Sequence, residues 1–384
     1  RRPPRSTPKP SSAASDVYKR QGYDIVREVE NLPHAPTDDK HLPDAKLSVI
    51  GDLIAIDHWK QRAFLISNIL ITDEGSEISL EEKYQNAISR LEDLAEKGAV
   101  GSEEPLMFPT PLDEDLPEVI STFQTDQFCL AVEAAKEHII DGDIFQVVLS
   151  QRFDVQLDAD PFDVYRVLRQ INPSPYMYFF RYDDFTIVGA SPEPMVRLIE
   201  GKVISRPIAG TRKRGKTEQE DRLLASELKE DPKELAEHVM LLDLARNDVG
   251  RVVEFGSERV DETMTLEKYS HVMHLTSQVS GDLRNDISPI DVLRATLPAG
   301  TVSGAPKVRA MQIIDSLEPT KRGPYAGVVG YFDFSGNIDT AITIRTMIVK
   351  DGVASVQAGA GIVADSDPHA EAVSYTHLTL PTKA

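Results

Sequence analysis

Residues 325–361 read YAGVVGYFDFSGNIDTAITIRTMIVKDGVASVQAGAG. Apolar and β-branched residues dominate this segment, and a Ser-Gly-Asn turn at 335–337 separates two runs in which apolar and polar side chains alternate. Alternation on both sides of a short turn that contains glycine is typical of a β-hairpin. The last third of the chain is therefore predicted to be rich in strands.

The rest of the chain mixes strand-like and helix-like segments. Short apolar runs predict strands at 46–56, 62–71, 144–155, 176–182 and 185–191. Apolar residues at helical spacing predict helices at 80–97, at 125–140, at 232–248 and from near residue 306. No regular βαβ rhythm and no internal repeat is visible, so the fold class is predicted to be α+β.

The composition of the chain argues against several classes of protein. The 384 residues include 62 acidic and 42 basic residues, which gives a net charge of −20. This acidic balance disfavours a nucleic-acid-binding protein, since such proteins carry a basic face. The single cysteine, Cys129, excludes a disulfide framework and a zinc cluster of cysteines. No apolar run reaches the ~18 residues of a membrane helix, and a cytoplasmic protein is the simplest expectation.

Both ends of the sequence differ from the rest. Residues 1–21 are rich in Arg, Pro and Ser, and residues 373–384 read VSYTHLTLPTKA. The first segment has some features of a transit peptide, but both ends are more similar to translated adaptor or vector sequence. We therefore expect 1–21 to be foreign or disordered and 373–384 to be a foreign tail.

The strongest local motif is EDPKELAEHVMLLDLARNDVGR at 230–251. Asp231 suits the N-cap of a helix, Pro232 its first position, and Glu234 the third position of a capping box. Glu234 and Glu237 are three residues apart and share one helix face. Paired carboxylates suit Mg²⁺, although a capped helix with a solvated acidic turn explains the same residues.

Four other motifs carry possible chemistry. The turn AGTVSGAPK at 299–307 precedes a helix and predicts an anion site or a simple tight turn, but it lacks the Walker A ending. Gly359 and Gly361 leave the backbone of a strand open to a ligand or mark a bulge. Arg345 suits a carboxylate. The basic loop at 206–216 is too short and lacks the aromatic residues of a nucleic-acid site.

Taken together and in this order, the motifs resemble the chorismate-utilising enzymes, and within them the large subunits of anthranilate synthases. The resemblance covers nearly all of residues 22–372 and is most specific in LARNDVGR and GTVSGAPK. It implies antiparallel sheets in a sandwich with helices outside. It also implies a remnant of an N-terminal regulatory region with a linker at 22–120 and a catalytic, chorismate-binding domain at 121–372.

The resemblance also implies a site for chorismate and Mg²⁺. Glu237 matches a direct metal ligand, and Glu234 and Glu371 match carboxylates that support the metal. Glu193 matches the general acid that protonates the departing C4 hydroxyl. The remaining matches are the catalytic residues His274 and Thr301 and the substrate-binding residues Thr211, Tyr325, Arg345, Gly359, Gly361 and Lys307.

The implied reaction is amination of chorismate followed by loss of pyruvate, which gives anthranilate. Gln146 stands where isochorismate synthases carry a lysine that activates water, and ammonia needs no such base. Ala209 in PIAGT favours the same reaction over that of aminodeoxychorismate synthases, although isochorismate synthases share it. The chain shows no glutaminase motif, so a separate glutamine amidotransferase subunit is implied as the source of ammonia.

Two alternatives stay open: an aminodeoxychorismate synthase subunit, and a fragment that binds ligand or partner without catalysis. Pro175, Tyr176 and Met177 match part of a tryptophan feedback site whose upstream part is missing, so inhibition by tryptophan is predicted to be weak. Ser374 stands where the family has a second direct metal ligand. Its loss is expected to weaken metal binding ~10-fold or more.

Overall fold

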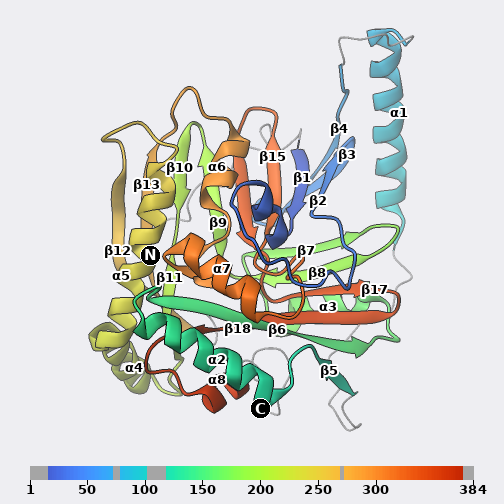
Figure 1. Ribbon diagram of the computed structural model, residues 1–384. Helices are drawn as coiled ribbons and strands as arrows, with labels where there is room; N and C mark the ends of the chain where they lie inside the picture. The colour runs from blue at the N-terminus through green and yellow to red at the C-terminus, as the bar shows by residue number, and fades with distance from the viewer. Residues whose placement is uncertain (1–15, 72–77, 102–117, 269–271, 375–384) are drawn as a thin grey trace.

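Two large antiparallel sheets meet in the body of the protein, with helices on their outer faces (Figure 1). The computed structural model describes residues 16–71, 78–101, 118–268 and 272–374, and the side chains of 22–71, 78–101, 118–268 and 272–372. The α+β class and the antiparallel sheets are both confirmed. A smaller unit, made of a two-stranded sheet and one helix, stands beside the body.

The first large sheet has nine strands and contains the predicted hairpin. Its strands, in spatial order, are β11 (Ile208–Lys213), β13 (Val272–Asp282), β10 (Lys202–Ser205), β9 (Pro194–Ile199), β16 (Ile338–Ile342), β15 (Val328–Asp333), β1 (Asp16–Gln21) and β2 (Ala45–Val49), and β12 (Arg259–Lys268) pairs with β13. In the β15–β16 turn, the side chain of Asp333 accepts a hydrogen bond from the Asn337 N–H at 2.8 Å. Gly336 adopts a φ of +89°, which a glycine accepts without strain.

The second large sheet has seven strands. They are, in spatial order, β14 (Gly304–Ala305), β6 (Gln146–Gln156), β18 (Val353–Ile362), β17 (Thr346–Lys350), β8 (Thr186–Ser191) and β7 (Tyr176–Arg181), and β5 (Val119–Ser121) pairs with β6. The long β6–β18 ladder runs from the pair Gln156–Val353 to the pair Val147–Ile362. In Figure 1 these strands cross the lower half of the molecule, at a steep angle to the first sheet.

Helices cover the sheets. They are the short 3₁₀ turns η1 (Tyr23–Glu28) and η2 (Gly300–Val302), and the helices α1 (Leu80–Ala99), α2 (Thr125–Ile140), α3 (Pro161–Ile171), α4 (Glu218–Glu230), α5 (Pro232–Gly250), α6 (Pro289–Thr296), α7 (Lys307–Leu317) and α8 (Pro368–Ser374). The predicted helices correspond to α1, α2, α5 and α7, whereas α3, α4, α6 and α8 are not predicted from the sequence. Phe128, Leu149, Val196, Leu293 and Met311 belong to the main core, where helices and both sheets meet.

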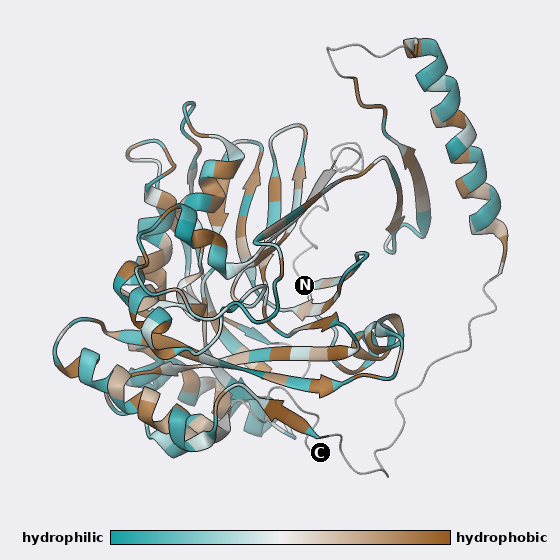
Figure 2. Cartoon of the chain, turned by 45° about the vertical axis from the view of Figure 1, so that its right-hand side comes forward, coloured by the Kyte–Doolittle hydropathy of each residue, from teal (hydrophilic) through white to brown (hydrophobic). Residues whose placement is uncertain are grey.

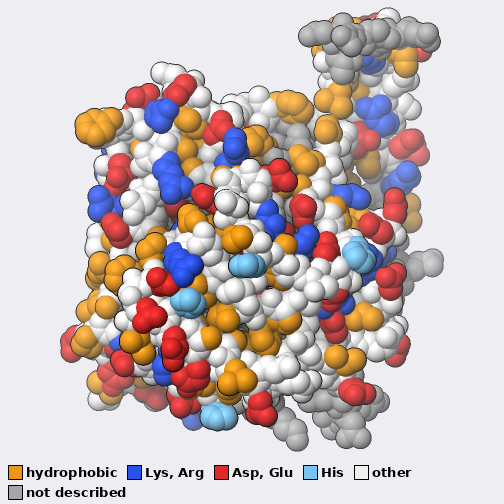
Figure 3. Space-filling model, in the orientation of Figure 1, with side chains coloured by type: hydrophobic (Ala, Val, Ile, Leu, Met, Phe, Trp, Pro, Cys, Tyr) orange, Lys and Arg blue, Asp and Glu red, His pale blue; other side chains and the backbone are white. Residues whose placement is uncertain are grey.

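The predicted strand at 46–56 is in fact two strands in different sheets. β2 ends at Val49, and β3 (Asp52–Asp57) pairs with β4 (Arg62–Ser67) in the small sheet. The chain turns at Ile50–Gly51, and the sequence mark of this break is the Gly51-Asp52 pair inside the apolar run. The small sheet and α1 rise from the body as a separate arm (Figure 2), which is also visible as a column in Figure 3. Trp59 on this arm is 83% exposed.

The predicted foreign ends fall partly inside the described residues. Asp16–Gln21 forms β1, which pairs with β15 and β2, so the end of the segment 1–21 has a place in the first sheet. Residues 1–15 and 375–384, together with 102–117 of the predicted linker, lie outside the described residues.

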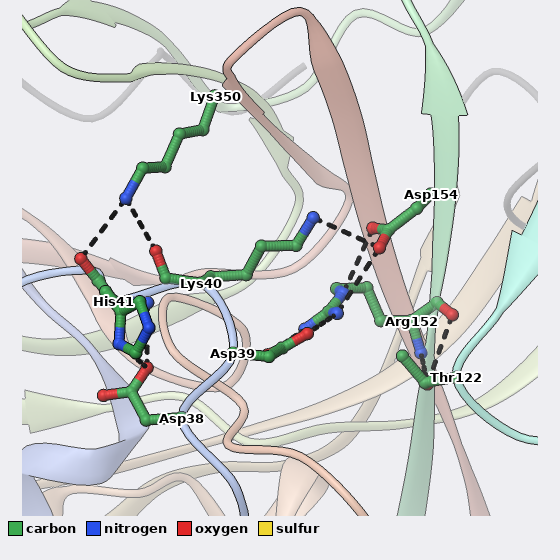
Figure 4. A network of polar contacts seen from close by, with 8 residues as sticks. All are labelled: Asp38, Asp39, Lys40, His41, Thr122, Arg152, Asp154 and Lys350. Carbon is green, nitrogen blue, oxygen red and sulfur yellow. Dashed lines mark hydrogen bonds and ion pairs between the residues drawn. The ribbon is translucent and has the colours of Figure 1, made fainter.

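A network of ion pairs holds the loop 38–41 against the second sheet (Figure 4). Arg152 on β6 donates to Asp39, with Nη1 3.1 Å from Oδ1, and also to Asp154. Lys40 pairs with Asp154 at 3.1 Å, and Lys350 donates to the Lys40 carbonyl oxygen at 2.7 Å. The segment between η1 and β2 is thus fixed to strands that follow it by more than a hundred residues. Among the described helices, none is long and apolar enough to cross a membrane.

Replacing Phe128 by alanine is expected to lower the free energy of unfolding by ~3–5 kcal/mol. Its ring is fully buried and packs edge-on against Phe123, with centroids 5.5 Å apart. Leu130→Ala on the same helix is the control, because Leu130 is 70% exposed and its loss leaves no cavity. Denaturant unfolding measures both variants, and equal losses would contradict this account of the core.

Candidate active site

A carboxyl group that is protonated near neutral pH lies between the two large sheets. Glu193 sits in the turn between β8 and β9 and accepts a hydrogen bond from Thr301 Oγ1 of η2 at 3.0 Å. Withdrawal from water raises the pKa of Glu193 to about 7, and the Thr301 bond and the charge of Arg345 oppose this rise. A carboxyl group with such a pKa can donate a proton at neutral pH.

Arg345 supplies a positive charge beside this carboxyl group. It lies between β16 and β17 with a φ of +49°, and its carbonyl oxygen accepts from the Ala190 N–H at 3.1 Å, which anchors this unusual backbone. The residue as a whole is exposed to solvent. Partial burial of its guanidinium group lowers the pKa of Arg345, and the charge of Glu193 opposes that change. A guanidinium group in this setting suits a carboxylate ligand, which it can bind with two hydrogen bonds.

A neutral imidazole lies near the same arginine. His274 on β13 faces Thr211 on β11, and its Nδ1 is 3.1 Å from Thr211 Oγ1 and 3.0 Å from the Gly210 carbonyl oxygen. Because a carbonyl oxygen only accepts, Nδ1 carries the proton. Burial lowers the pKa of His274, and the charge of Arg345 lowers it further.

Two carboxylates project from the first turns of α5. Asp231 caps the helix by accepting from the N–H groups of Lys233 and Glu234, as predicted. Glu234 does not complete the predicted capping box; its carboxylate accepts from Arg212 Nη1 at 2.8 Å instead. Burial and the negative charge of Glu234 raise the pKa of Glu237, and a hydrogen bond with Gln146 opposes the rise. Adjacent carboxylates of this kind are stabilised by a divalent cation.

The glycines of β18 permit close approach of two polar side chains. A Cβ at position 361 would lie 2.5 Å from Gln146 Nε2, and one at 359 would lie 2.7 Å from the Tyr325 hydroxyl oxygen. A side chain at either position would therefore displace the polar group that lies against it. Burial raises the pKa of Tyr325 to about 12, so its hydroxyl keeps its proton at neutral pH. Gly359 and Gly361 thus lie on β18, with the Tyr325 hydroxyl against the first of them.

Two of the predicted site residues, Lys307 and Glu371, form hydrogen bonds with other groups of the protein. Lys307 is buried, and its Nζ donates to Asp248 at 2.6 Å and to the Thr296 carbonyl oxygen at 3.1 Å. Its charge therefore neutralises Asp248, which lies in the same cleft of about 400 Å³ as Glu193 and Thr301. Glu371 accepts from Ser366 Oγ at 2.9 Å within the turn that leads into α8.

The predicted metal ligands are not gathered into one cluster. Within the part of the chain that the structure describes, no three His, Cys, Asp or Glu side chains are arranged to hold a metal. Glu234 and Glu237 lie together, whereas Glu371 belongs to α8, which packs against α2 and β18. The side chain of Ser374 lies outside the described residues.

The predicted tryptophan-site residues lie at the edge of the second sheet. Tyr176 on β7 donates a hydrogen bond to Asp339 of β16 at 2.9 Å, and Asp339 also pairs with Arg197. Pro175 precedes this strand and Met177 is half-buried in it. These residues lie where β7 of the second sheet meets β16 of the first.

Two buried charges near the site are not predicted from the sequence. Arg322 and Glu318, which follow α7, are 3% and 5% exposed and form an ion pair of 2.6 Å. Their only sequence signal is a pair of opposite charges four residues apart beside the turn before Tyr325. That spacing is common on solvated surfaces, so the sequence did not single them out.

Comparison with known proteins agrees with this geometry. The sequence model of the chorismate binding enzymes matches residues 2–373. The chain belongs to this family. The match includes residues 2–21 and so gives no support to the prediction that this segment is foreign.

Within the family, the chain is similar to anthranilate synthase component 1. It is 49% identical over 355 residues to the protein of Acetivibrio thermocellus, covering 91% of this chain and 70% of that protein. It is 48% identical to the protein of Bacillus caldotenax, with the same coverage. The crystal structure of anthranilate synthase component I from Streptococcus pneumoniae TIGR4 superposes with a TM-score of 0.82 and 41% identity, over 95% of this chain and 79% of that one.

The fold extends to more distant proteins. The menaquinone-specific isochorismate synthase MenF of Escherichia coli has a TM-score of 0.72 and 19% identity, over 98% of this chain and 90% of that one. At this identity the likeness concerns the fold alone.

Replacing Arg345 by glutamine is expected to raise the pKa of Glu193 by about one pH unit, because the positive charge that favours the carboxylate is removed. The pKa is measured by NMR titration of protein labelled at the glutamate carboxyl carbon, with the signal assigned from Glu193→Gln. Arg197→Gln is the control, since Arg197 lies on the strand after Glu193 but pairs with Asp339. An unchanged pKa in Arg345→Gln would contradict the described electrostatics.

Proposed function

We propose that the chain aminates chorismate and eliminates pyruvate, giving anthranilate in the first committed step of tryptophan biosynthesis. The observation that carries the proposal is Glu193, whose pKa is about 7, held by Thr301 beside Arg345. The similarity to anthranilate synthase component 1 selects the reaction within the family.

The residues divide the reaction between binding and proton transfer. Arg345 and Tyr325 hold the enolpyruvyl carboxylate, and the backbone of β18 at Gly359 and Gly361 lies along the substrate. Ammonia attacks C2 while the C4–O bond breaks, and Glu193 gives its proton to the departing hydroxyl, which leaves as water. Loss of the C2 proton and cleavage of the C3–O bond then make the ring aromatic and release enolpyruvate, which takes up a proton to become pyruvate. Neutral His274, fixed by Gly210 and Thr211, borders the ring.

Mg²⁺ is the proposed cofactor. Glu237 would bind it, with Glu234 and Glu371 in support, and the raised pKa of Glu237 beside Glu234 fits a site that favours a cation. When bound, the metal polarises the ring carboxylate of the substrate as a Lewis acid. Glu234 would then exchange its Arg212 partner for the hydration shell of the metal.

The residue Gln146 favours ammonia over water as the nucleophile. Its amide is neutral and hydrogen-bonds with Glu237, so it cannot act as a base toward water. Free ammonia is a nucleophile without such a base. We propose that a glutamine amidotransferase subunit in the cytoplasm supplies it, and that tryptophan inhibits only weakly through Pro175, Tyr176 and Met177.

Incubation with chorismate, Mg²⁺ and an ammonium salt is expected to yield anthranilate, detected by fluorescence after chromatography. The rate should be bell-shaped over a range of about pH 6 to 9, because free ammonia increases with pH while protonated Glu193 decreases above pH 7. Glu193→Gln is expected to lower kcat about 100-fold or more. Glu133→Gln, on the exposed face of α2, is the control.

The other outcomes identify the alternatives. Aminodeoxychorismate as the final product would assign the sister reaction. Binding of chorismate without turnover, even with added Mg²⁺, would indicate a fragment that binds but does not catalyse.

Ser374→Glu is expected to tighten Mg²⁺ binding ~10-fold or more. Position 374 is three residues after Glu371 in the sequence and is the last residue of α8. Isothermal titration with Mg²⁺ in the presence of chorismate measures the change. Ser374→Gln, which adds the same bulk without charge, is the control, and equal affinities in the two variants would contradict the proposed ligand position.

A further inference from the structure

Arg322 is a buried arginine at the junction of the two large sheets. Its guanidinium binds Glu318 through two bonds, from Nε to Oε2 at 2.9 Å and from Nη2 to Oε1 at 2.6 Å. It also donates to two main-chain carbonyl oxygens, from Nη1 to Val302 at 2.7 Å and from Nη2 to Val148 at 2.6 Å. One planar group thus links the end of α7 to η2, 20 residues away in the sequence, and to β6, 174 residues away.

The segments that Arg322 holds are those that carry the site. Val302 follows Thr301 in η2, and Thr301 makes the hydrogen bond to Glu193. Val148 on β6 is the backbone partner of Gly361 on β18. Glu318 extends the set, because its Oε1 accepts from both the N–H and the hydroxyl of Ser150, at 2.8 and 2.9 Å.

Two aromatic rings pack against the same guanidinium. Its central carbon lies 4.8 Å from the ring centroid of Tyr23 and 5.5 Å from that of Tyr325. Stacking on a guanidinium plane orients a ring as well as stabilising the charge. The Tyr325 hydroxyl in turn lies against Gly359, on the proposed substrate side of β18.

We infer that Arg322 is a positioning residue, which sets the Thr301 loop and the Tyr325 ring against β6 and β18 so that both face the substrate. This role rests on the proposed function, because it treats Thr301 and Tyr325 as groups of the site. A lysine cannot replace it, since a single ammonium cannot reach both carbonyl oxygens and make two bonds to Glu318.

Arg322→Lys tests the inference. With the η2 loop released, the hydrogen bond from Thr301 to Glu193 weakens, and the pKa of Glu193 is expected to rise by about one pH unit. We expect Thr301→Val, which removes the same hydrogen bond, to raise it similarly. The pKa is measured by the NMR titration described above, which needs no turnover. In active protein, KM for chorismate is also expected to rise several-fold because Tyr325 is displaced.

Arg27→Lys is the matched control. Arg27 binds Asp315 of α7 through two bonds of 2.7 Å, but it has no bond to η2 or β6. We expect this variant to lose stability while Glu193 titrates as in the unchanged protein. A general loosening of the fold would shift Glu193 in both variants and would overturn the inference.

The result is decisive whether or not the chain forms anthranilate. If Thr301→Val raises the pKa of Glu193 and a folded Arg322→Lys does not, Arg322 does not position the loop. If Arg322→Lys does not fold, Glu318→Gln replaces it, because this change keeps the size of the side chain and weakens its hold on Arg322. We expect a smaller rise in the pKa of Glu193 there, and an unchanged value would overturn the inference.

Discussion

The β6–β18 ladder is the constraint on which the rest of the site depends. Its ten residue pairs place Gly359 opposite Ser150 and Gly361 opposite Val148. In the sheet, β14 lies next to β6 and β17 lies next to β18. The N–H of Val148 also donates to the Ser303 carbonyl oxygen at 2.8 Å, which brings the η2 loop beside the same strands. A shift by one residue would turn every side chain of β18 to the opposite face.

Buried ion pairs add to the constraint that the β6–β18 ladder places on the site. The pairs Arg322–Glu318 and Lys307–Asp248 lie on two sides of the η2 loop, and each charged group has a partner. Breaking such a pair by removing one member costs ~3–5 kcal/mol, because the other charge stays buried. Arrangements of the η2 loop that would break either ion pair are therefore disfavoured, and a single arrangement is favoured. That arrangement holds Thr301 at 3.0 Å from Glu193 in a protein whose net charge is −20.

The isochorismate synthase MenF has the same fold, so the fold alone does not select a reaction and side chains of the site must do so. We propose that Gln146 takes part in this selection. Its amide lies against the backbone at Gly361 and hydrogen-bonds with Glu237, and it offers no basic lone pair to activate water. Two arginines of the basic loop at 206–216 have a structural role instead. Arg212 pairs with Asp231 and Glu234, and Arg214 pairs with Asp221.

The sequence by itself determined the features that depend on neighbours along the chain. The cap of α5 by Asp231, the shared face of Glu234 and Glu237, the β15–β16 hairpin and the four predicted helices all follow from local spacing and backbone preference. The family resemblance added the candidate residues, but not their surroundings. Only the tertiary structure decided that Glu193 meets Thr301, 108 residues away, that Lys307 neutralises Asp248, and that Arg322 joins η2 to β6. These contacts depend on burial and on register between distant strands, and neither is encoded in the spacing of residues along the chain.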